Sequence, residues 1–105
     1  MNNKKHICWI NGNWGKNNHL TLPLSDRGLN LGDGIFETIL ILKGQPMLLK
    51  NHIKRWDRTA DILKMARPPK IEWLLPLIDE AIDRTHLQTS NGVLRLNWSR
   101  GNSAD

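Results

Sequence analysis

The chain has 105 residues, 39% of them hydrophobic and 24% charged, which is the size of one domain with a small core and too apolar for disorder. Its net charge of +5 is scattered among acidic residues and forms no stripe along which a nucleic-acid backbone would bind. The chain has one cysteine, no signal-peptide core and no apolar run near the ~18 residues of a membrane span. It is therefore expected to be cytoplasmic, with no disulfide, metal cluster, nucleic-acid partner or membrane partner.

The amino-terminal part is predicted to form a β-hairpin. Residues 7–10 favour a short strand, and Asn11-Gly12-Asn13 is a strong turn signal that returns the chain through Trp14. Residues 16–24 contain Pro23 and show no hydrophobic period, so a strand remnant running into a loop is expected there.

The stretch from Ser25 to Leu42 begins as a loop and ends as a long strand. Three glycines and two aspartates in its first ten residues allow the backbone to turn tightly without a helix. From Ile35 onward both alternating faces are largely apolar, which is typical of a strand covered on both sides. Glu37 is an exception, and a buried carboxylate is costly unless it is paired or hydrogen-bonded. We expect Glu37 to anchor the preceding loop by accepting backbone N–H groups.

After this strand the hydrophobic period becomes helical. Lys43-Gly44 ends the strand, and residues 45–49 are predicted to pair back against it as the second arm of a hairpin. A helix is then expected from an N-cap at Asn51 up to a stop at Arg67-Pro68-Pro69. Its apolar positions recur at steps of three and four residues, at Ile53, Trp56, Ala60 and Leu63.

A second helix is predicted from about Leu75 to His86. Residues 71–74 are expected to form an entry turn, because proline at Pro76 is tolerated in a first turn and damaging further inside a helix. After a turn at Asn91-Gly92, alternation over residues 93–98 predicts a strand. One face of that strand carries Leu94, Leu96 and Trp98, and the other carries Arg95 and Asn97.

This order of elements predicts an α+β fold. We expect a mostly antiparallel sheet with two helices packed on one side, in a single domain over residues 1–105. The five tryptophans are expected to be packing residues, because Trp9, Trp56 and Trp98 each fall in the apolar phase of their element.

Five short motifs occur in a characteristic order and spacing. They are Trp9-Ile10-Asn11-Gly12, Ser25-Asp26-Arg27-Gly28 followed by Gly32-Asp33-Gly34-Ile35-Phe36-Glu37-Thr38, Gly44 before a short strand, His52-Ile53-Lys54-Arg55, and Leu94-Arg95-Leu96 with Ser99-Arg100-Gly101. With them the chain resembles, over essentially its whole length, the amino-terminal small domain of the class IV aminotransferases, the fold-type-IV enzymes that use pyridoxal 5'-phosphate. Within that family the Gly-Asp-Gly form and the Asn-Gly-Val-Leu to Ser-Arg-Gly segment look most like the aminodeoxychorismate lyases.

The resemblance implies that Arg55 holds the cofactor phosphate. The chemistry agrees, since a phosphate dianion suits a planar, permanently charged donor on a rigid helix. The residues alone leave open a surface arginine paired with Asp57 or Asp61. His52 precedes Arg55 by three residues, so it is expected to share its helix face and either orient the arginine or close the pocket wall.

The resemblance also places Phe36 at the substrate pocket and Arg95 on the active-site side of its strand. The alternatives are a core phenylalanine and an exposed strand arginine. Phe36, Arg95, Glu37 and His52 are therefore the candidate substrate-pocket residues, and Arg55 is the candidate cofactor-binding residue. We expect no catalytic residue and no metal ligand in this chain.

Catalysis with pyridoxal phosphate needs a lysine that binds the cofactor and moves the α-proton. The family supplies it from a carboxy-terminal domain, which we expect to be absent from this chain because the sequence stops at Asp105. None of the eight lysines lies in a run that would bury and deprotonate an amine. The chain alone is therefore expected to be inactive, as a fragment or as half of a site completed elsewhere.

The function implied for the complete enzyme is that of an aminodeoxychorismate lyase of the folate pathway, which releases 4-aminobenzoate and pyruvate from a small-molecule amino substrate. The alternatives are the small domain of a D-amino-acid or branched-chain amino-acid aminotransferase, and a non-catalytic interaction module that keeps the fold. The apolar faces of the strands from Ile35 and near Trp98 must be covered by another domain or a second copy, and the resemblance likewise implies a homodimer.

Overall fold

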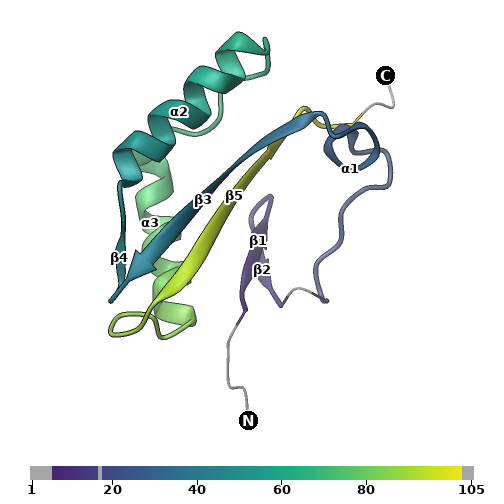
Figure 1. The fold of residues 1–105 in the computed structure, drawn as a ribbon. Helices are drawn as coiled ribbons and strands as arrows, with labels where there is room; N and C mark the ends of the chain where they lie inside the picture. The colour runs from purple at the N-terminus through teal and green to yellow at the C-terminus, as the bar shows by residue number, and fades with distance from the viewer. Residues whose placement is uncertain (1–5, 17, 103–105) are drawn as a thin grey trace.

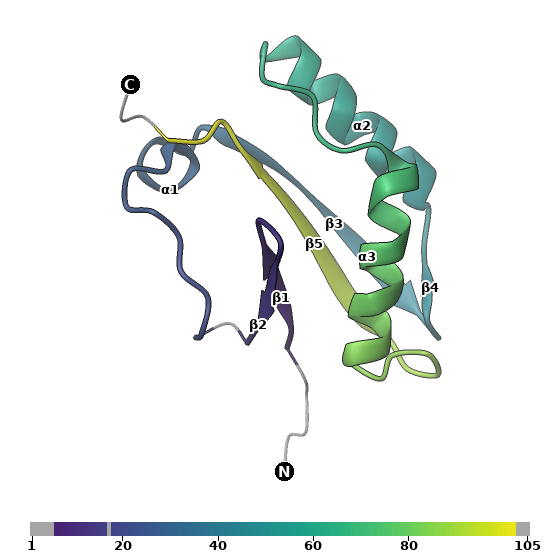
Figure 2. The same cartoon turned by 180° about the vertical axis from the view of Figure 1, so that it is seen from behind.

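The computed structural model describes residues 6–16 and 18–102. Its elements are β1 (Cys8–Ile10), β2 (Asn13–Gly15), α1 (Arg27–Leu31), β3 (Gly34–Leu42), β4 (Gln45–Pro46), α2 (Leu49–Ile62), α3 (Ile71–Arg84) and β5 (Gly92–Ser99). An antiparallel sheet has the order β4-β3-β5, and β1 and β2 form a separate antiparallel pair (Figure 1). Both long helices lie on the same side of the three-stranded sheet, as the reverse view also shows (Figure 2). The predicted α+β class is confirmed.

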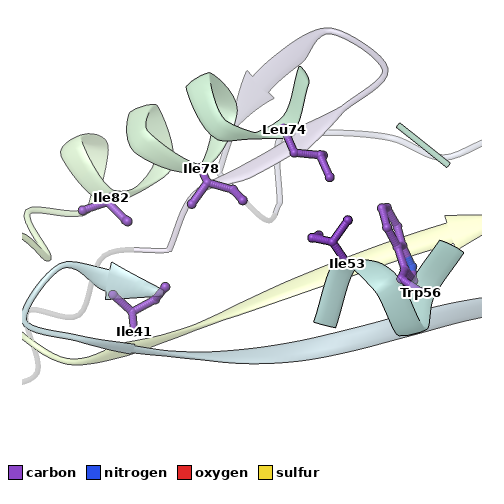
Figure 3. Close-up of a cluster of buried hydrophobic side chains, with 6 residues drawn as sticks. All are labelled: Ile41, Ile53, Trp56, Leu74, Ile78 and Ile82. Atoms are coloured by element: carbon purple, nitrogen blue, oxygen red, sulfur yellow. The ribbon is translucent and has the colours of Figure 1, made fainter. Parts of the chain in front are cut away.

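The hydrophobic core lies between the sheet and the two long helices. Ile41 of β3 is 1% exposed and packs within a cluster drawn from α2 and α3 (Figure 3). The helical members are Ile53 and Trp56 of α2 and Leu74, Ile78 and Ile82 of α3. The hydrophobic period predicted Ile53 and Trp56, whereas Leu63 of the same period lies just past the end of α2 and is 46% exposed.

The predicted amino-terminal hairpin is confirmed. Asn11 and Gly12 both adopt positive φ, as a type I′ turn requires, and Trp9 stands opposite Trp14. Trp9 makes an edge-to-face contact with Trp73 of α3 at 5.7 Å between ring centres. The hairpin is therefore fixed to α3 by aromatic packing.

The prediction that residues 25–34 contain no helix was wrong, because α1 lies within them. Asp26 caps its first turn by accepting a hydrogen bond from the Leu29 N–H at 2.9 Å, and Gly32 ends it with φ of 63°. A helix of five residues is too short to show a hydrophobic period, so its only sequence signal is the aspartate before it and the glycine after it.

The boundaries of the long helices also differ from the prediction. Strand β4 is only two residues long, and Leu48, which has a positive φ, leads directly into the helix. Helix α2 therefore begins at Leu49, and Asn51 is not its N-cap. α3 begins at Ile71 and contains Pro76, where an entry turn over residues 71–74 was predicted. Packing of Leu74 in the core accounts for helical structure ahead of the proline.

The two faces of β3 have different environments. Ile35, Glu37, Ile39 and Ile41 face the helices, and the alternate residues are exposed. The prediction that β3 is covered on both sides is therefore not met within the described residues. We call the exposed side of β3 and β5 the open face; it carries Phe36, Thr38, Leu40, Leu42, Val93, Arg95 and Asn97. Among the described residues, no helix has the length and apolar character needed to cross a membrane.

Candidate functional site

A buried carboxylate on β3 holds an arginine and a histidine of α2. Glu37 is 5% exposed and accepts two hydrogen bonds from Arg55, from Nε to Oε2 at 2.8 Å and from Nη2 to Oε1 at 2.7 Å. The Nδ1 atom of His52 lies 2.6 Å from the same Oε1. This two-pronged pairing fixes the plane of the Arg55 guanidinium.

The charges of this cluster follow from the contacts. The hydrogen bonds from Arg55 lower the pKa of Glu37 below its ordinary value of 4.5, burial opposes them, and the bond from His52 lowers the pKa further. The same pair raises the pKa of Arg55. Because an ionised carboxylate only accepts hydrogen bonds, His52 must carry its hydrogen on Nδ1 and donate it to Glu37.

These contacts correct one sequence expectation and exclude one alternative that the sequence left open. Glu37 does not anchor the preceding loop through backbone N–H groups, because its oxygens accept from side chains of α2. Arg55 does not pair with the acids near it in the sequence, because Asp57 and Asp61 bind Arg67. His52 lies on the helix-facing side of β3 with Glu37, so it is not on the open face.

The outer edge of Arg55 remains available to a ligand. The side chain is 61% exposed, and within residues 6–16 and 18–102 no acceptor is bonded to its Nη1. Glu37 also lines a groove of about 260 Å³ between β3 and α2, together with Gly34, Ile35, Phe36, Trp56 and Thr59. A preoriented guanidinium beside an open groove fits a phosphate or another oxyanion.

The open face brings two other candidate residues together. The guanidinium carbon of Arg95 lies 3.9 Å from the centre of the Phe36 ring, a cation–π contact, and its Nε donates to the Asn97 side-chain oxygen at 3.1 Å. Phe36 is 56% exposed, so the alternative of a core phenylalanine is excluded within the described chain. Arg95 projects opposite to Leu94 and Leu96, as alternation predicted.

The five candidate residues therefore form two clusters and not one. Glu37, His52 and Arg55 meet on the helix-facing side of β3, whereas Phe36 and Arg95 meet on the open face. The peptide bond between Phe36 and Glu37 joins the clusters, because successive residues of a strand point to opposite faces.

A third polar cluster, which the sequence analysis missed, fixes the start of β3. Ser99 Oγ donates to the buried Asp26 carboxylate at 2.7 Å and accepts from the Gly28 N–H at 3.1 Å. Arg100 binds Asp33 through Nε and donates to two carbonyl oxygens at the end of α2. The motif residues around 26–33 and 99–101 therefore tie α1, β5 and α2 together.

The Glu37 cluster predicts a specific pH dependence of stability. The folded-state pKa is below the unfolded one, so the ion pair stabilises the fold fully above about pH 4.5 and this contribution is lost as the pH falls through the folded pKa. Glu37→Gln is expected to lower the free energy of unfolding by about 1 kcal/mol at pH 7. The difference in stability between this variant and the unmodified chain should shrink towards pH 3. Urea unfolding of both proteins from pH 7 to pH 3 measures it; a difference that is independent of pH would contradict the assignment.

Comparisons with known proteins agree with this architecture. The model of the family "Amino-transferase class IV" matches residues 34–105. Aminodeoxychorismate lyase of Bacillus subtilis is 30% identical over 90% of this chain and 32% of its own length. D-alanine aminotransferase of Listeria innocua is 26% identical over 83% of this chain and 30% of its own length.

A solved structure shows the same fold. A hypothetical aminotransferase from Mycobacterium tuberculosis, in its PLP-bound form, superposes with a TM-score of 0.78 and 28% identity over 90% of this chain and 33% of its own. The fold is that of the small domain of a fold-type-IV aminotransferase. The chain belongs to the class IV aminotransferase family, and it spans about a third of the length of the relatives that it matches.

Proposed function

We propose that this chain is the small domain of a pyridoxal-phosphate enzyme of the aminodeoxychorismate lyase type, in which Arg55 anchors the cofactor phosphate. The observation that carries the proposal is the buried Glu37 carboxylate, which holds the Arg55 guanidinium through Nε and Nη2 and leaves its outer edge exposed. The cofactor-bound structure of the Mycobacterium tuberculosis relative supports the cofactor class.

Each residue of the Glu37 cluster has a distinct part in this proposal. Arg55 binds the phosphate through charge-assisted hydrogen bonds from its exposed edge. Glu37 fixes the guanidinium plane, and its own negative charge is balanced by Arg55. When bound, pyridoxal phosphate supplies the electron sink that stabilises negative charge at the α-carbon of the substrate.

The open face supplies one wall of the substrate pocket in this proposal. Phe36 presents an exposed aromatic surface, and Arg95 lies over it as a cation. A substrate with an unsaturated ring and a carboxylate would find an aromatic surface and a charged donor side by side there. This combination suits aminodeoxychorismate.

The lysine for proton transfer would come from a part of the enzyme other than this domain. The six lysines that the structure describes are all exposed, so none lies in a buried pocket. We further propose a cytoplasmic homodimer in which a second domain or copy covers the open face. The exposed apolar side chains of Phe36, Leu40 and Val93 support the presence of such a covering domain or copy.

The alternative of a D-amino-acid aminotransferase small domain has a specific observation in its favour. D-alanine aminotransferases align with this chain over a similar share and at only slightly lower identity than the Bacillus subtilis lyase. The lyase is preferred for its higher identity and for the arginine on the open face, which suits a carboxylated ring substrate.

A hybrid protein tests the proposal. This chain would replace the matching third of the Bacillus subtilis lyase, and the product would be assayed for pyruvate release from 4-amino-4-deoxychorismate and for amino transfer from D-alanine. Pyruvate release without an amino acceptor is expected, with the unaltered lyase as the control. Dominant amino transfer would favour the alternative, and a folded, cofactor-bound hybrid with neither activity would contradict both.

A further inference from the structure

The Arg95 side chain on the open face is fixed from two directions. Asn97, two residues further along β5, accepts the Nε hydrogen of Arg95 at 3.1 Å. Asn97 is also the cross-strand neighbour of Phe36, whose ring centre lies 3.9 Å from the guanidinium carbon. The ring therefore fixes the plane of the guanidinium, and Asn97 fixes its rotation within that plane.

This arrangement leaves one edge of the guanidinium for a ligand. A guanidinium binds two oxygens either through Nε and one Nη or through both Nη atoms. Asn97 occupies Nε, and no residue within 6–16 and 18–102 accepts a hydrogen bond from either Nη atom of Arg95. The available edge therefore presents two parallel N–H donors, the spacing that a carboxylate matches.

The charge of the open face also favours a negatively charged ligand at Arg95. Its residues Phe36, Thr38, Leu40, Leu42, Val93, Arg95 and Asn97 include no acid, and no described carboxylate forms an ion pair with Arg95. The other paired arginines of the structure are held by acids, whereas the partners of Arg95 are a ring and an amide. Its positive charge is therefore not neutralised by the domain.

We propose that Asn97 is a positioning residue that orients Arg95 so that its two Nη atoms bind a carboxylate group of an anionic substrate on the open face. An arginine that is held in one rotamer loses less side-chain entropy when its ligand binds than a free one does. The placement of substrate on this face rests on the proposed function. The orientation of Arg95 by Asn97 follows from the contacts of these two side chains and is independent of the proposed function.

The experiment is nuclear magnetic resonance of the full chain, with benzoate as a flat carboxylate probe. Benzoate should shift the side-chain N–H signals of Arg95, and Asn97→Leu, which removes the acceptor at nearly constant size, should weaken the response by about fivefold or more. Asn97→Asp keeps an acceptor but adds a competing charge. It should preserve the hydrogen-bonded position of the Arg95 Nε signal and abolish the benzoate response.

Two controls separate positioning from a general effect on the fold. Ile62→Val changes an exposed residue of α2, outside the open face, at nearly equal size, and should leave the benzoate response unchanged. In an Arg95→Leu background, Asn97→Leu should have no further effect on benzoate binding followed through backbone signals of β3 and β5.

Three results would overturn the proposal. They are an Asn97→Leu response equal to that of the unmodified chain, additive effects of the Arg95 and Asn97 substitutions, and no benzoate response at Arg95 in the unmodified chain. The measurement needs neither cofactor nor the hybrid protein. Its failure is therefore distinguishable from failure of the proposed lyase activity.

Discussion

Replacing Arg55 by alanine in the hybrid protein is expected to weaken binding of pyridoxal phosphate by at least about tenfold, because a charge-assisted phosphate contact is lost. Arg55→Lys should recover only part of the affinity, since an ammonium group cannot pair with Glu37 through two parallel bonds while it binds phosphate. Cofactor affinity would be measured by titration of the absorbance of the bound cofactor. Unchanged affinity in Arg55→Ala would remove this residue from the phosphate site.

The controls for this prediction must separate lost binding from lost folding. Arg55→Ala also leaves the Glu37 carboxylate buried without its arginine, which destabilises the domain. The double variant Glu37→Leu with Arg55→Leu removes both charges, so it should fold better than Arg55→Ala and still bind cofactor weakly. Arg58→Ala, on the same helix and exposed, changes the net charge equally and should leave cofactor affinity near that of the unmodified hybrid.

The role of α2 in this site follows from its register against β3. His52 and Arg55 are one helical turn apart, and both reach a carboxylate that precedes them by 15 and 18 residues in the sequence. The helical period predicted that the two share a face, but no local pattern identifies Glu37 as their common partner. That contact depends on how α2 packs across the sheet, which only the structure shows.

On the open face, too, the sequence predicts which residues share a face but not which of them are in contact. Strand alternation alone predicted that Arg95 and Asn97 lie opposite Leu94 and Leu96, and this is confirmed. The contact of Arg95 with Phe36 depends on the register that sets Phe36 opposite Asn97, and no turn joins β3 directly to β5 to fix that register in the sequence. Local periodicity therefore predicts faces, and the tertiary pairing decides which side chains of a face meet.

The elements that sequence reasoning misplaced are those whose boundaries depend on capping or tertiary packing and not on period. The five residues of α1 are specified by Asp26 and Gly32, and the buried Asp26 is in turn held by Ser99 at the far end of the chain. Helix α3 keeps a regular start ahead of Pro76 because Leu74 is buried against the sheet and α2. Tertiary contacts outweigh local propensity at both places.

Replacing Ile41 by alanine should have the largest effect on stability. Ile41 is 1% exposed and packs against both long helices, so its truncation leaves a cavity and should cost about 2–5 kcal/mol in the free energy of unfolding. A domain of this size has only about 5–15 kcal/mol in total, so a large share of its stability would be lost. Urea unfolding followed by tryptophan fluorescence measures the change.

The neighbouring residue of the same strand provides the matched control for Ile41. Leu40 points to the open face and is 48% exposed, so Leu40→Ala should cost less than about 1 kcal/mol in the isolated chain. Ile41→Val should fall between the two, at about 0.5–1.5 kcal/mol. Equal losses for Ile41→Ala and Leu40→Ala would mean that the open face is buried in solution, as by a second copy of the chain. In that case the loss for Leu40→Ala should grow with protein concentration, because stability that comes from association depends on the concentration of the partner.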